Sequence, residues 1–345
     1  MPERLVTVAS YGPGGSSARV RILDWLVHTG LTAELHEYLG AADNQPGTLA
    51  RSPLRVLSAE AALRRLPAQL AGRNLLLSRR ATPFSSGRLE ARLLTGAARG
   101  VYDVDDALYA DTGGLLRRAW YAPAVWQRAV AAADVVIAGN EVLAERAAVH
   151  ADEVVIIPSC VEPGLYRRKA HYERGDVPRA IWIGSPSTEH HLSLIADALL
   201  AVHRTHGMRL TVVSSGSRSL GPLDAIVDRA AWTAGTFSRI LADADVGIMP
   251  LYDTEFSRGK CAYKLLQYGA AALPVVGSPV GTNAAVLAGL GGSAPARGEW
   301  ADALAAVFDA SASARTNLGV AARRAVEESY SFAAWEARWR SAVGV

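Results

Sequence analysis

Two lysines in the last third of the chain stand in sequence that is otherwise apolar. Lys260 and Lys264 are four residues apart and Gln267 follows three later, so one helix would place all three on the same face. A cation in a first helical turn opposes the helix dipole, whereas the free N–H groups there attract negative charge. A phosphate bound beside both lysines removes this conflict, so the segment predicts an anion site. The alternative is two solvated lysines.

The stretch from Gly259 to Gly281 resembles the donor-site helix and following strand of GT-B glycosyltransferases, most closely family 4. The resemblance implies an α/β chain with the GT-B fold, in which two Rossmann-like, doubly wound parallel-sheet domains face a cleft. It also implies transfer of a sugar from a nucleoside diphosphate sugar to a hydroxyl or amine, with retention of anomeric configuration. Most members carry two glutamates separated by seven residues. Here Gly259 and Gln267 occupy those two places.

The resemblance further implies roles for individual residues. Lys260 and Lys264 are expected to stabilise the leaving diphosphate, and Asp105 and Asp106 are the expected catalytic residues on the acceptor side. The expected donor-binding residues are Gly14, Gly15, Ser185, Ser187, Thr188, Ser214, Trp232, Arg258, Gly259, Lys260, Lys264 and Gln267. The expected acceptor-binding residues are Ser16, Arg19, Asp103, Asp105 and Asp106. No metal and no tightly bound cofactor are expected, because the nucleoside diphosphate sugar is a co-substrate.

Three carboxylates fall within four residues of the segment YDVDDALY, residues 102–109, which resembles a segment found in a subset of these enzymes. Carboxylates this close repel each other unless they meet cations or hydroxyls, which favours an acceptor-side role for Asp105 or Asp106. Two alternatives remain. One aspartate could cap a helix, or Asp103 and Asp105 could hold magnesium or manganese.

Two loops that follow predicted strands could bind phosphate. In IWIGSPSTEHHL, residues 181–192, a strand is followed by serine and threonine hydroxyls and exposed N–H groups. In GPGGSS, residues 12–17, the first two glycines also fit a dinucleotide fingerprint, with Glu37 about twenty residues further on. Ser17 stands where that fingerprint requires its third glycine, so NAD binding is the less favoured interpretation.

Strands alternate with helices in both halves of the chain, which predicts parallel sheets covered by helices. The predicted strands are 5–9, 33–38, 74–78, 100–102, 134–138, 153–157, 179–184, 209–214, 245–249 and 274–277. The predicted divisions are an acceptor-side domain (1–162), a linker (163–178), a nucleotide-sugar-binding domain (179–328) and a C-terminal helix crossing back to the first domain (329–345). Trp335 and Trp339 lie four residues apart, which predicts that this helix docks onto a domain.

Composition agrees with a two-domain cytoplasmic enzyme. Half of the 345 residues are hydrophobic, and Lys plus Arg exceed Asp plus Glu by only three, so no overall field attracts nucleic acid. A basic stretch from Arg73 to Arg99 is followed by the acidic residues of 103–106, and mutual neutralisation is favoured over contact with a membrane surface. Cys160 and Cys261 are far apart in sequence, which suits a reducing compartment. No apolar run reaches the length of about 18 residues that a spanning helix requires.

These features predict a cytoplasmic glycosyltransferase whose partners are a nucleotide sugar and a small-molecule or glycan acceptor, without nucleic acid. The Ala-, Arg- and Gly-rich composition is compatible with specialised-metabolite or envelope-glycan biosynthesis. Two other classes remain open. One is a non-catalytic nucleotide-sugar-binding protein, suggested by Gly259 at the glutamate position. The other is a nucleotide-sugar epimerase of the same architecture, which would convert the donor without an acceptor.

Overall fold

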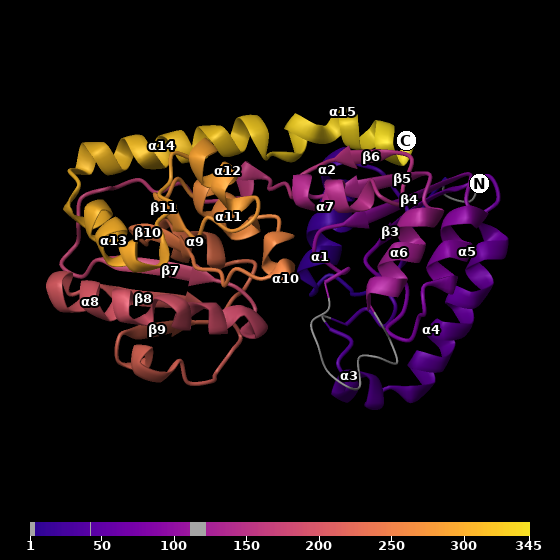
Figure 1. Cartoon of the computed structure of the whole chain (residues 1–345), viewed down its shortest axis with the longest axis horizontal. Helices are drawn as coiled ribbons and strands as arrows, with labels where there is room; N and C mark the ends of the chain where they lie inside the picture. The colour runs from indigo at the N-terminus through magenta and orange to yellow at the C-terminus, as the bar shows by residue number, and fades with distance from the viewer. Residues whose placement is uncertain (1–3, 42, 111–121) are drawn as a thin grey trace. The chain divides into compact units, whose positions relative to one another are not determined.

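A computed structural model describes residues 4–41, 43–110 and 122–345, which divide into two compact units (Figure 1). The first unit contains the described residues up to Ser159, together with Arg258–Cys261 and Trp335–Val345. The second unit contains Cys160–Ser257 and Ala262–Ala334. Each unit is built around one parallel sheet, as predicted from the alternation of strands and helices.

The sheet of the first unit has the order β2-β1-β3-β4-β5-β6, and every pairing is parallel. Its strands are β1 (Leu5–Ala9), β2 (Glu34–His36), β3 (Asn74–Ser78), β4 (Arg99–Val104), β5 (Val135–Ala138) and β6 (Val154–Ile156). The helical segments are α1 (Ser16–Ala18), η1 (Arg19–Leu23), α2 (Asp24–Thr29), α3 (Pro46–Ala50), α4 (Pro53–Arg65), η2 (Leu66–Gln69), α5 (Arg88–Gly96), α6 (Ala122–Ala132), α7 (Glu141–Ala147) and most of α15 (Phe332–Val343). Every residue of β1 and β3 is buried, as expected for central strands covered on both faces.

The sheet of the second unit has the order β11-β10-β7-β8-β9, again entirely parallel. Its strands are β7 (Arg179–Ile183), β8 (Arg209–Val213), β9 (Val227–Ala230), β10 (Val246–Met249) and β11 (Val275–Gly277). The helical segments are η4 (Pro163–Leu165), η5 (Pro186–Ile195), α8 (Ala196–His206), η6 (Gly221–Ala225), α9 (Phe237–Ala242), α10 (Glu255–Arg258), α11 (Tyr263–Ala270), α12 (Asn283–Gly289), η7 (Arg297–Glu299), α13 (Trp300–Asp309) and α14 (Ala312–Ser329). Read in chain order, this is the 3-2-1-4-5 arrangement of a doubly wound fold.

Alternate residues of β7 enter separate hydrophobic cores on the two faces of this sheet. Ile181 and Ile183 pack with Leu265 of α11, whereas Ala180 and Trp182 pack with residues of α8 and α13. This alternation follows from the two-residue period of a strand. It leaves the loop after β7 fixed at the carboxyl end of a strand that is buried on both sides.

The strand β9 is absent from the sequence-based prediction. It is the edge strand of its sheet, and Asp228 and Arg229 interrupt its apolar residues, so its pattern is weak. Residues 163–178, predicted as a linker, group with the second unit. Tyr166 and Tyr172 are buried in this segment, and the N–H of Lys169 donates to the carbonyl of Ala271 at 2.9 Å.

The C-terminal helix α15 packs on the first unit through stacked indole rings. Trp339 is 1% exposed, and its ring lies parallel to that of Trp25 in α2 with a centroid separation of 5.0 Å. The carbonyls of Val343 and Gly344 accept hydrogen bonds from Asn74 at the start of β3. Among the described helices, none is both long and apolar enough to cross a membrane.

Replacing Trp339 with alanine should destabilise the first unit by about 3–5 kcal/mol, because it removes a buried ring and the stacking contact of that ring with Trp25. The shift of the urea unfolding midpoint measures this. Arg338→Ala changes an exposed residue on the same helix and should shift stability by less than about 0.5 kcal/mol. Equal shifts for both variants would contradict the packing role of Trp339.

Candidate functional site

Polar residues gather where strands end in each of the two sheets. In parallel α/β sheets, ligands bind outside the carboxyl ends of the strands, at the point where the strand order reverses. That point lies between β1 and β3 in the first unit and between β7 and β10 in the second. The predicted site residues that follow these strands therefore stand at the expected places within each unit.

A buried ion pair lies under the site of the first unit. Arg21 of η1 is 1% exposed and donates two hydrogen bonds to Asp103 of β4 through Nε, at 3.0 and 3.1 Å, and one through Nη2, at 2.7 Å. It also donates to the carbonyl of Ile157, just past β6. Burial opposes the charge of Arg21, but Asp103 outweighs it and raises the pKa of Arg21. Burial raises the pKa of Asp103, and Arg21 opposes this effect. Asp103 is thus engaged in the core.

The carboxylates of Asp105 and Asp106 meet two cations. Nη1 of Arg79 lies 3.3 Å from Asp105 and 2.8 Å from Asp106, and it donates to the hydroxyl of Ser17 at 2.7 Å. Nζ of Lys260 lies 3.3 Å from the other oxygen of Asp106. All four charged side chains keep between 12% and 18% of their surface exposed, so a ligand can reach them. These cations relieve the repulsion between the neighbouring carboxylates, and the acceptor-side role of Asp105 and Asp106 stays a prediction.

Electrostatics hold Asp106 in its charged form. Burial favours protonation of this carboxyl, but Lys260 and Arg79 outweigh it and lower its pKa below the ordinary value of 3.8. The same carboxylates raise the pKa of Arg79 against the effect of burial. The cluster is therefore a charged, partly accessible group whose aspartates can accept hydrogen bonds from hydroxyls.

The segment Arg258–Cys261 joins the first unit at this cluster. Nδ2 of Asn140, the N-cap of α7, donates to the carbonyls of Gly259 and Lys260 at 3.1 and 3.3 Å. The thiol of Cys261 donates to the carbonyl of Asp105 at 3.2 Å, and burial raises its pKa to about 12. These contacts fix the backbone that carries Lys260.

The prediction that Lys260 and Lys264 share a helical face is wrong. Helix α11 begins at Tyr263, after Ala262 in the left-handed region with a φ of 53°. Lys264 lies in its first turn, whereas Lys260 lies in the preceding loop. The helix cannot begin earlier without losing the contacts of Gly259, Lys260 and Cys261 with Asn140 and Asp105.

Gly259, at the position where family 4 enzymes usually carry a glutamate, has no room for a side chain. A Cβ atom built on it would lie 2.6 Å from the Cβ and 3.0 Å from the backbone nitrogen of Ala107. The glycine therefore allows this backbone to pack directly on the YDVDDALY segment. Its neighbour Arg258 ends α10 and is exposed.

The glycine loop after β1 is shaped by close backbone packing. The N–H of Gly15 donates to the carbonyl of Gly12 at 2.8 Å, and a Cβ on Gly12 would lie 2.3 Å from the carbonyl oxygen of Gly40. The close approach of these two backbone segments requires glycine at position 12, so dinucleotide binding is not needed to explain this residue. Gly14 and Ser16 are exposed beside α1, while Arg19 is half-buried and acts electrostatically on Asp24.

In the second unit, the loop after β7 and the first turn of α11 come together. A Cβ on Gly184 would lie 2.5 Å from the Trp182 ring and 2.9 Å from Cε of Lys264, so only glycine allows this approach. The ammonium of Lys264 lies 5.4 Å from the centroid of the Trp182 ring, a cation–π contact. Lys264 thereby stands at the carboxyl end of β7, as an anion site there requires.

The three hydroxyls predicted on this loop form a local group. The Oγ of Ser185, the N-cap of η5, lies 3.0 Å from the Oγ of Ser187 and 3.4 Å from the Oγ1 of Thr188. Ser185 and Ser187 are exposed, and Thr188 is half-buried. The N–H of Thr188 donates to the carbonyl of Ser185. The hydroxyls and the remaining N–H groups at this turn can bind phosphate oxygens.

A second ion pair fixes the loop after β8. Arg229 of β9 pairs with the buried Glu189 of η5 at 3.2 and 3.1 Å and donates to the carbonyls of Gly216 and Arg218. A Cβ on Gly216 would lie 2.1 Å from the Glu189 carboxylate. Ser214 is buried and accepts a hydrogen bond from the N–H of Gly216. Ser214 therefore shapes this loop from within.

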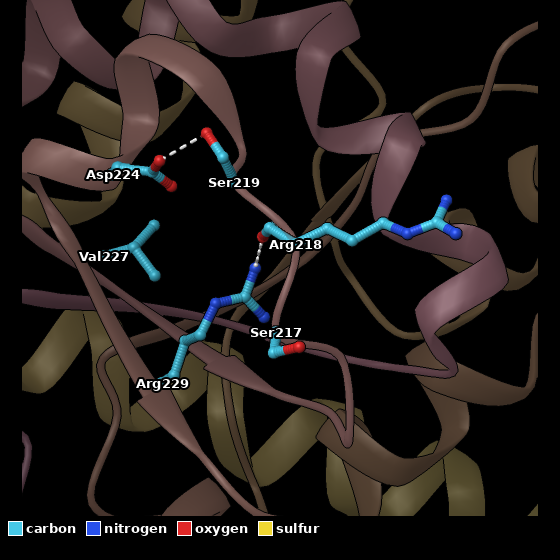
Figure 2. Close-up of a pocket in the computed structure, with 6 residues that line it drawn as sticks. All are labelled: Ser217, Arg218, Ser219, Asp224, Val227 and Arg229. Carbon is cyan, nitrogen blue, oxygen red and sulfur yellow. Dashed lines mark hydrogen bonds between the residues drawn. The ribbon is translucent and has the colours of Figure 1, made fainter.

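A cavity of about 360 Å³ lies beside this loop. Figure 2 shows its lining residues, with Asp224 and Ser219 on one side and Arg229 on the other. Its lining residues are Ser217, Arg218, Ser219, Asp224, Val227 and Arg229. The guanidinium of Arg229 already binds the Arg218 carbonyl, and Asp224 accepts from Ser219, so both charged groups have protein partners.

Trp232 and Gln267 are linked by a chain of aromatic contacts in the second unit. Trp232 is 38% exposed and stacks on Phe237, which packs edge-on against Tyr166. Gln267 is buried, and its amide donates to the Tyr166 hydroxyl at 3.3 Å. Trp232 is thus partly exposed just past the end of β9, whereas Gln267 supports the ring system from the core.

Several residues of these clusters were not singled out from the sequence: Arg79, Asn140, Trp182 and Glu189. Arg79 directly follows a buried strand and has a φ of 65°, a strained conformation that its sequence does not reveal. The only available signal was position, because each of the four stands at or near the end of a predicted strand. Their partners lie tens of residues away in sequence.

Residues 177–310 match the family model described as "Glycosyl transferases group 1". A comparison with curated protein sequences gave no match. The matched part contains the loops after β7 and β8 and Lys264, the residues that form the site of the second unit.

Several solved structures share this fold, and one of them, WaaG, is described as a glycosyltransferase. WaaG, involved in lipopolysaccharide biosynthesis, superposes with a TM-score of 0.70 at 15% identity, covering 99% of this chain and 100% of WaaG. A sucrose-phosphate synthase from Thermosynechococcus elongatus gives 0.70 at 14% identity, covering 98% and 97%. TarM gives 0.59 at 14% identity, covering 79% of this chain, which spans 54% of TarM.

The GT-B fold predicted from the sequence is confirmed by these structures and by the two parallel sheets. The match of residues 177–310 to the group 1 glycosyl transferase model agrees with the resemblance predicted from the sequence.

Replacing Asp106 with asparagine should lower stability by about 1–3 kcal/mol at neutral pH, because a charged hydrogen-bond acceptor is lost. The folded-state pKa of Asp106 is lowered, so its contribution is complete above the ordinary value of 3.8 and disappears as the pH falls through the lower folded-state value. Urea midpoints measured down this pH range should converge for wild type and variant. Asp152→Asn, at an exposed position, should show no such convergence.

Gly259→Ala should destabilise the first unit by about 1–3 kcal/mol, because its methyl group would overlap Ala107. Thermal unfolding measures the change. Gly175→Ala, where a Cβ would meet nothing within 4 Å, is the matched control. A Gly259→Ala protein as stable as the control variant would show that this backbone contact is loose.

Proposed function

From a GT-B fold whose second unit matches group 1 glycosyl transferases, we propose that this chain transfers a sugar from a nucleoside diphosphate sugar to an acceptor hydroxyl or amine with retention. The second unit binds the donor. The first unit binds the acceptor. The nucleoside diphosphate sugar is a co-substrate, and the proposal includes no tightly bound cofactor.

The observation that carries the proposal is Lys264 beside Gly184. Lys264 lies in the first turn of α11 and approaches the end of β7, where Gly184 has no Cβ. The ammonium group of Lys264 and the free N–H groups of the helix terminus can therefore bind the same anion. The hydroxyls of Ser185, Ser187 and Thr188 follow on the same loop. We assign the donor diphosphate to this place and the nucleobase to the exposed face of Trp232.

The proposed reaction needs no nucleophile from the protein. The bond from the sugar's anomeric carbon to the diphosphate breaks, and a bond from that carbon to the acceptor oxygen or nitrogen forms on the same face. The acceptor's proton passes to an oxygen of the leaving diphosphate. Lys264 acts by stabilising the negative charge that develops on the diphosphate.

On the acceptor side, we assign a hydrogen-bonding role to Asp105 and Asp106. Arg79 and Lys260 hold these carboxylates charged, so they can accept hydrogen bonds from acceptor hydroxyls and orient them. The role that we assign to Lys260 is to hold the carboxylate of Asp106 in its charged form. Asp103 acts beneath the site through Arg21.

The nucleotide to test first is UDP. A TarM mutant was crystallised with UDP, and a trehalose-phosphate synthase of the same fold is described as UDP-forming. Mixing the protein with UDP, GDP, ADP and dTDP in separate calorimetric titrations should give binding to one of them. UDP-sugar turnover is then measured by release of UDP with and without candidate acceptors.

Lys264→Met should weaken binding of that nucleoside diphosphate by about 10- to 100-fold, because it removes one charged hydrogen-bond donor and keeps the apolar stem. Calorimetry measures the affinity. Arg204→Met removes an exposed positive charge from α8 of the same unit and should leave the affinity unchanged.

The outcomes separate the proposal from its alternatives. Equal affinities of the Lys264→Met and Arg204→Met proteins would refute the diphosphate site. Tight nucleotide-sugar binding without sugar transfer to any acceptor would favour a binding protein, and conversion of the donor without an acceptor would favour an epimerase.

A further inference from the structure

Arg80 lies two residues past the end of β3, next in sequence to Arg79 of the aspartate cluster. Its backbone is fixed, because the hydroxyl of Ser10 donates to its carbonyl at 2.8 Å and accepts from its N–H at 3.2 Å. Its side chain is half-buried, yet within residues 4–41, 43–110 and 122–345 no protein group hydrogen-bonds or ion-pairs with its guanidinium. A guanidinium has five N–H donors in a planar fork, so this side chain offers a complete set of donors.

The other arginines at this end of the sheet show what a protein partner does. Arg21 and Arg79 pair with aspartates, which raise the pKa of each guanidinium against the effect of burial. For Arg80 the effect of burial prevails, and its pKa is lowered. The ordinary pKa of arginine lies so far above neutral pH that Arg80 still carries its charge. Arg80 is therefore a partly desolvated cation that no carboxylate of the described chain contacts.

The carboxylate of Glu90 attracts Arg80 through space, but its oxygens bind other donors. One oxygen accepts from the N–H of Ala81 at 3.0 Å, and the other accepts from the hydroxyl of Ser85. Glu90 is fully buried and is held in place by these donors. The N–H groups of Arg80 thus remain available to a ligand.

Tyr11, two residues past the end of β1, adds another donor in the same region. It is half-buried, and it acts electrostatically on both Arg79 and Arg80. Its hydroxyl makes no hydrogen bond to any residue that the structure describes. The strand order of this sheet reverses between β1 and β3, and ligands bind at such points. Tyr11 and Arg80 each follow one of these two strands, so their free donors stand at the expected ligand position.

We infer that Arg80 and Tyr11 bind an anionic group, a phosphate or a carboxylate, that the acceptor carries. The inference rests on the proposed function, because it adds the charge of the acceptor to the role of the first unit. Arg79 and Lys260 already meet the carboxylates of Asp105 and Asp106, so Arg80 is the cation that an acceptor anion can claim. Charge-assisted hydrogen bonds to the anion would compensate a charge that burial disfavours.

The test measures anion binding in the Lys264→Met protein, so that the diphosphate site of the second unit does not contribute. Inorganic phosphate and acetate are titrated at constant ionic strength, and the rise of the thermal unfolding midpoint gives the affinity. Adding Arg80→Gln should weaken binding of the preferred anion at least about tenfold, and adding Tyr11→Phe about threefold. The preference between the two anions tells a phosphorylated acceptor from a carboxylated one.

Two controls separate ligand binding from structure and from surface charge. Arg92→Gln removes an exposed positive charge from α5 and should leave the anion affinity unchanged. Without added anion, Arg80→Gln should unfold at the same midpoint as its parent or at a higher one, because it removes a charge that burial disfavours. A structural arginine would instead lower the midpoint when it is replaced.

A further measurement assigns the anion to the acceptor. In the otherwise wild-type chain, Arg80→Gln should leave the affinity for the nucleoside diphosphate unchanged, whereas Lys264→Met weakens it. Loss of nucleotide affinity in Arg80→Gln would assign the anion to the donor and overturn the inference.

Two other results would also overturn it. One is that the Lys264→Met protein binds neither phosphate nor acetate, and the other is that Arg80→Gln binds the anion as tightly as Arg92→Gln does. Failure of the proposed function is distinct, because it appears as missing nucleotide binding or sugar transfer by the wild-type chain, whereas the anion titrations contain no nucleotide.

Discussion

The site of the first unit depends on one buried charge pair. The guanidinium of Arg21 joins the helical turn after β1 to Asp103 near the end of β4 and to the carbonyl of Ile157 past β6. Such a pair contributes little net stability relative to an apolar core, but removing one partner leaves the other charged and buried. The pair therefore holds the helical turn η1 next to the carboxyl ends of β4 and β6. Asp105 and Asp106, two and three residues beyond Asp103, are placed by it.

The second constraint is the close packing of glycines against neighbouring backbone and side chains. Gly259 lets the Arg258–Cys261 segment pack against Ala107, and Gly184 lets Lys264 approach the end of β7. In both places a larger residue would push a lysine-bearing segment away from its position. Packing thus explains the glycine at the position where family 4 enzymes usually carry a glutamate. Lys260, in the same segment as Gly259, contributes its charge to the cluster of Asp105 and Asp106.

The second unit combines a rigid support with accessible polar groups. Glu189 and Arg229 fix the loop after β8, and Gln267 and Tyr166 support the aromatic stack that ends at Trp232. Ser185 and Ser187 of the loop after β7 are exposed, and so is part of Trp232. A ligand would meet a surface that is already ordered, which lowers the entropic cost of binding.

The sequence by itself determined the fold class and the places along the chain where chemistry could occur. Buried strands such as β1, β3 and β7 are continuous apolar runs followed by glycine, serine or charged residues, and that pattern depends only on local sequence. The edge strand β9 was missed because its charged residues weaken the pattern. Tertiary structure decided which groups meet. Lys260 left the predicted helix because its segment gains contacts with Asn140 and Asp105, residues more than a hundred positions earlier. Arg79 and Asp106, or Gln267 and Tyr166, pair for the same reason: hydrogen bonds and ion pairs depend on distance in space, which periodicity along the chain does not encode.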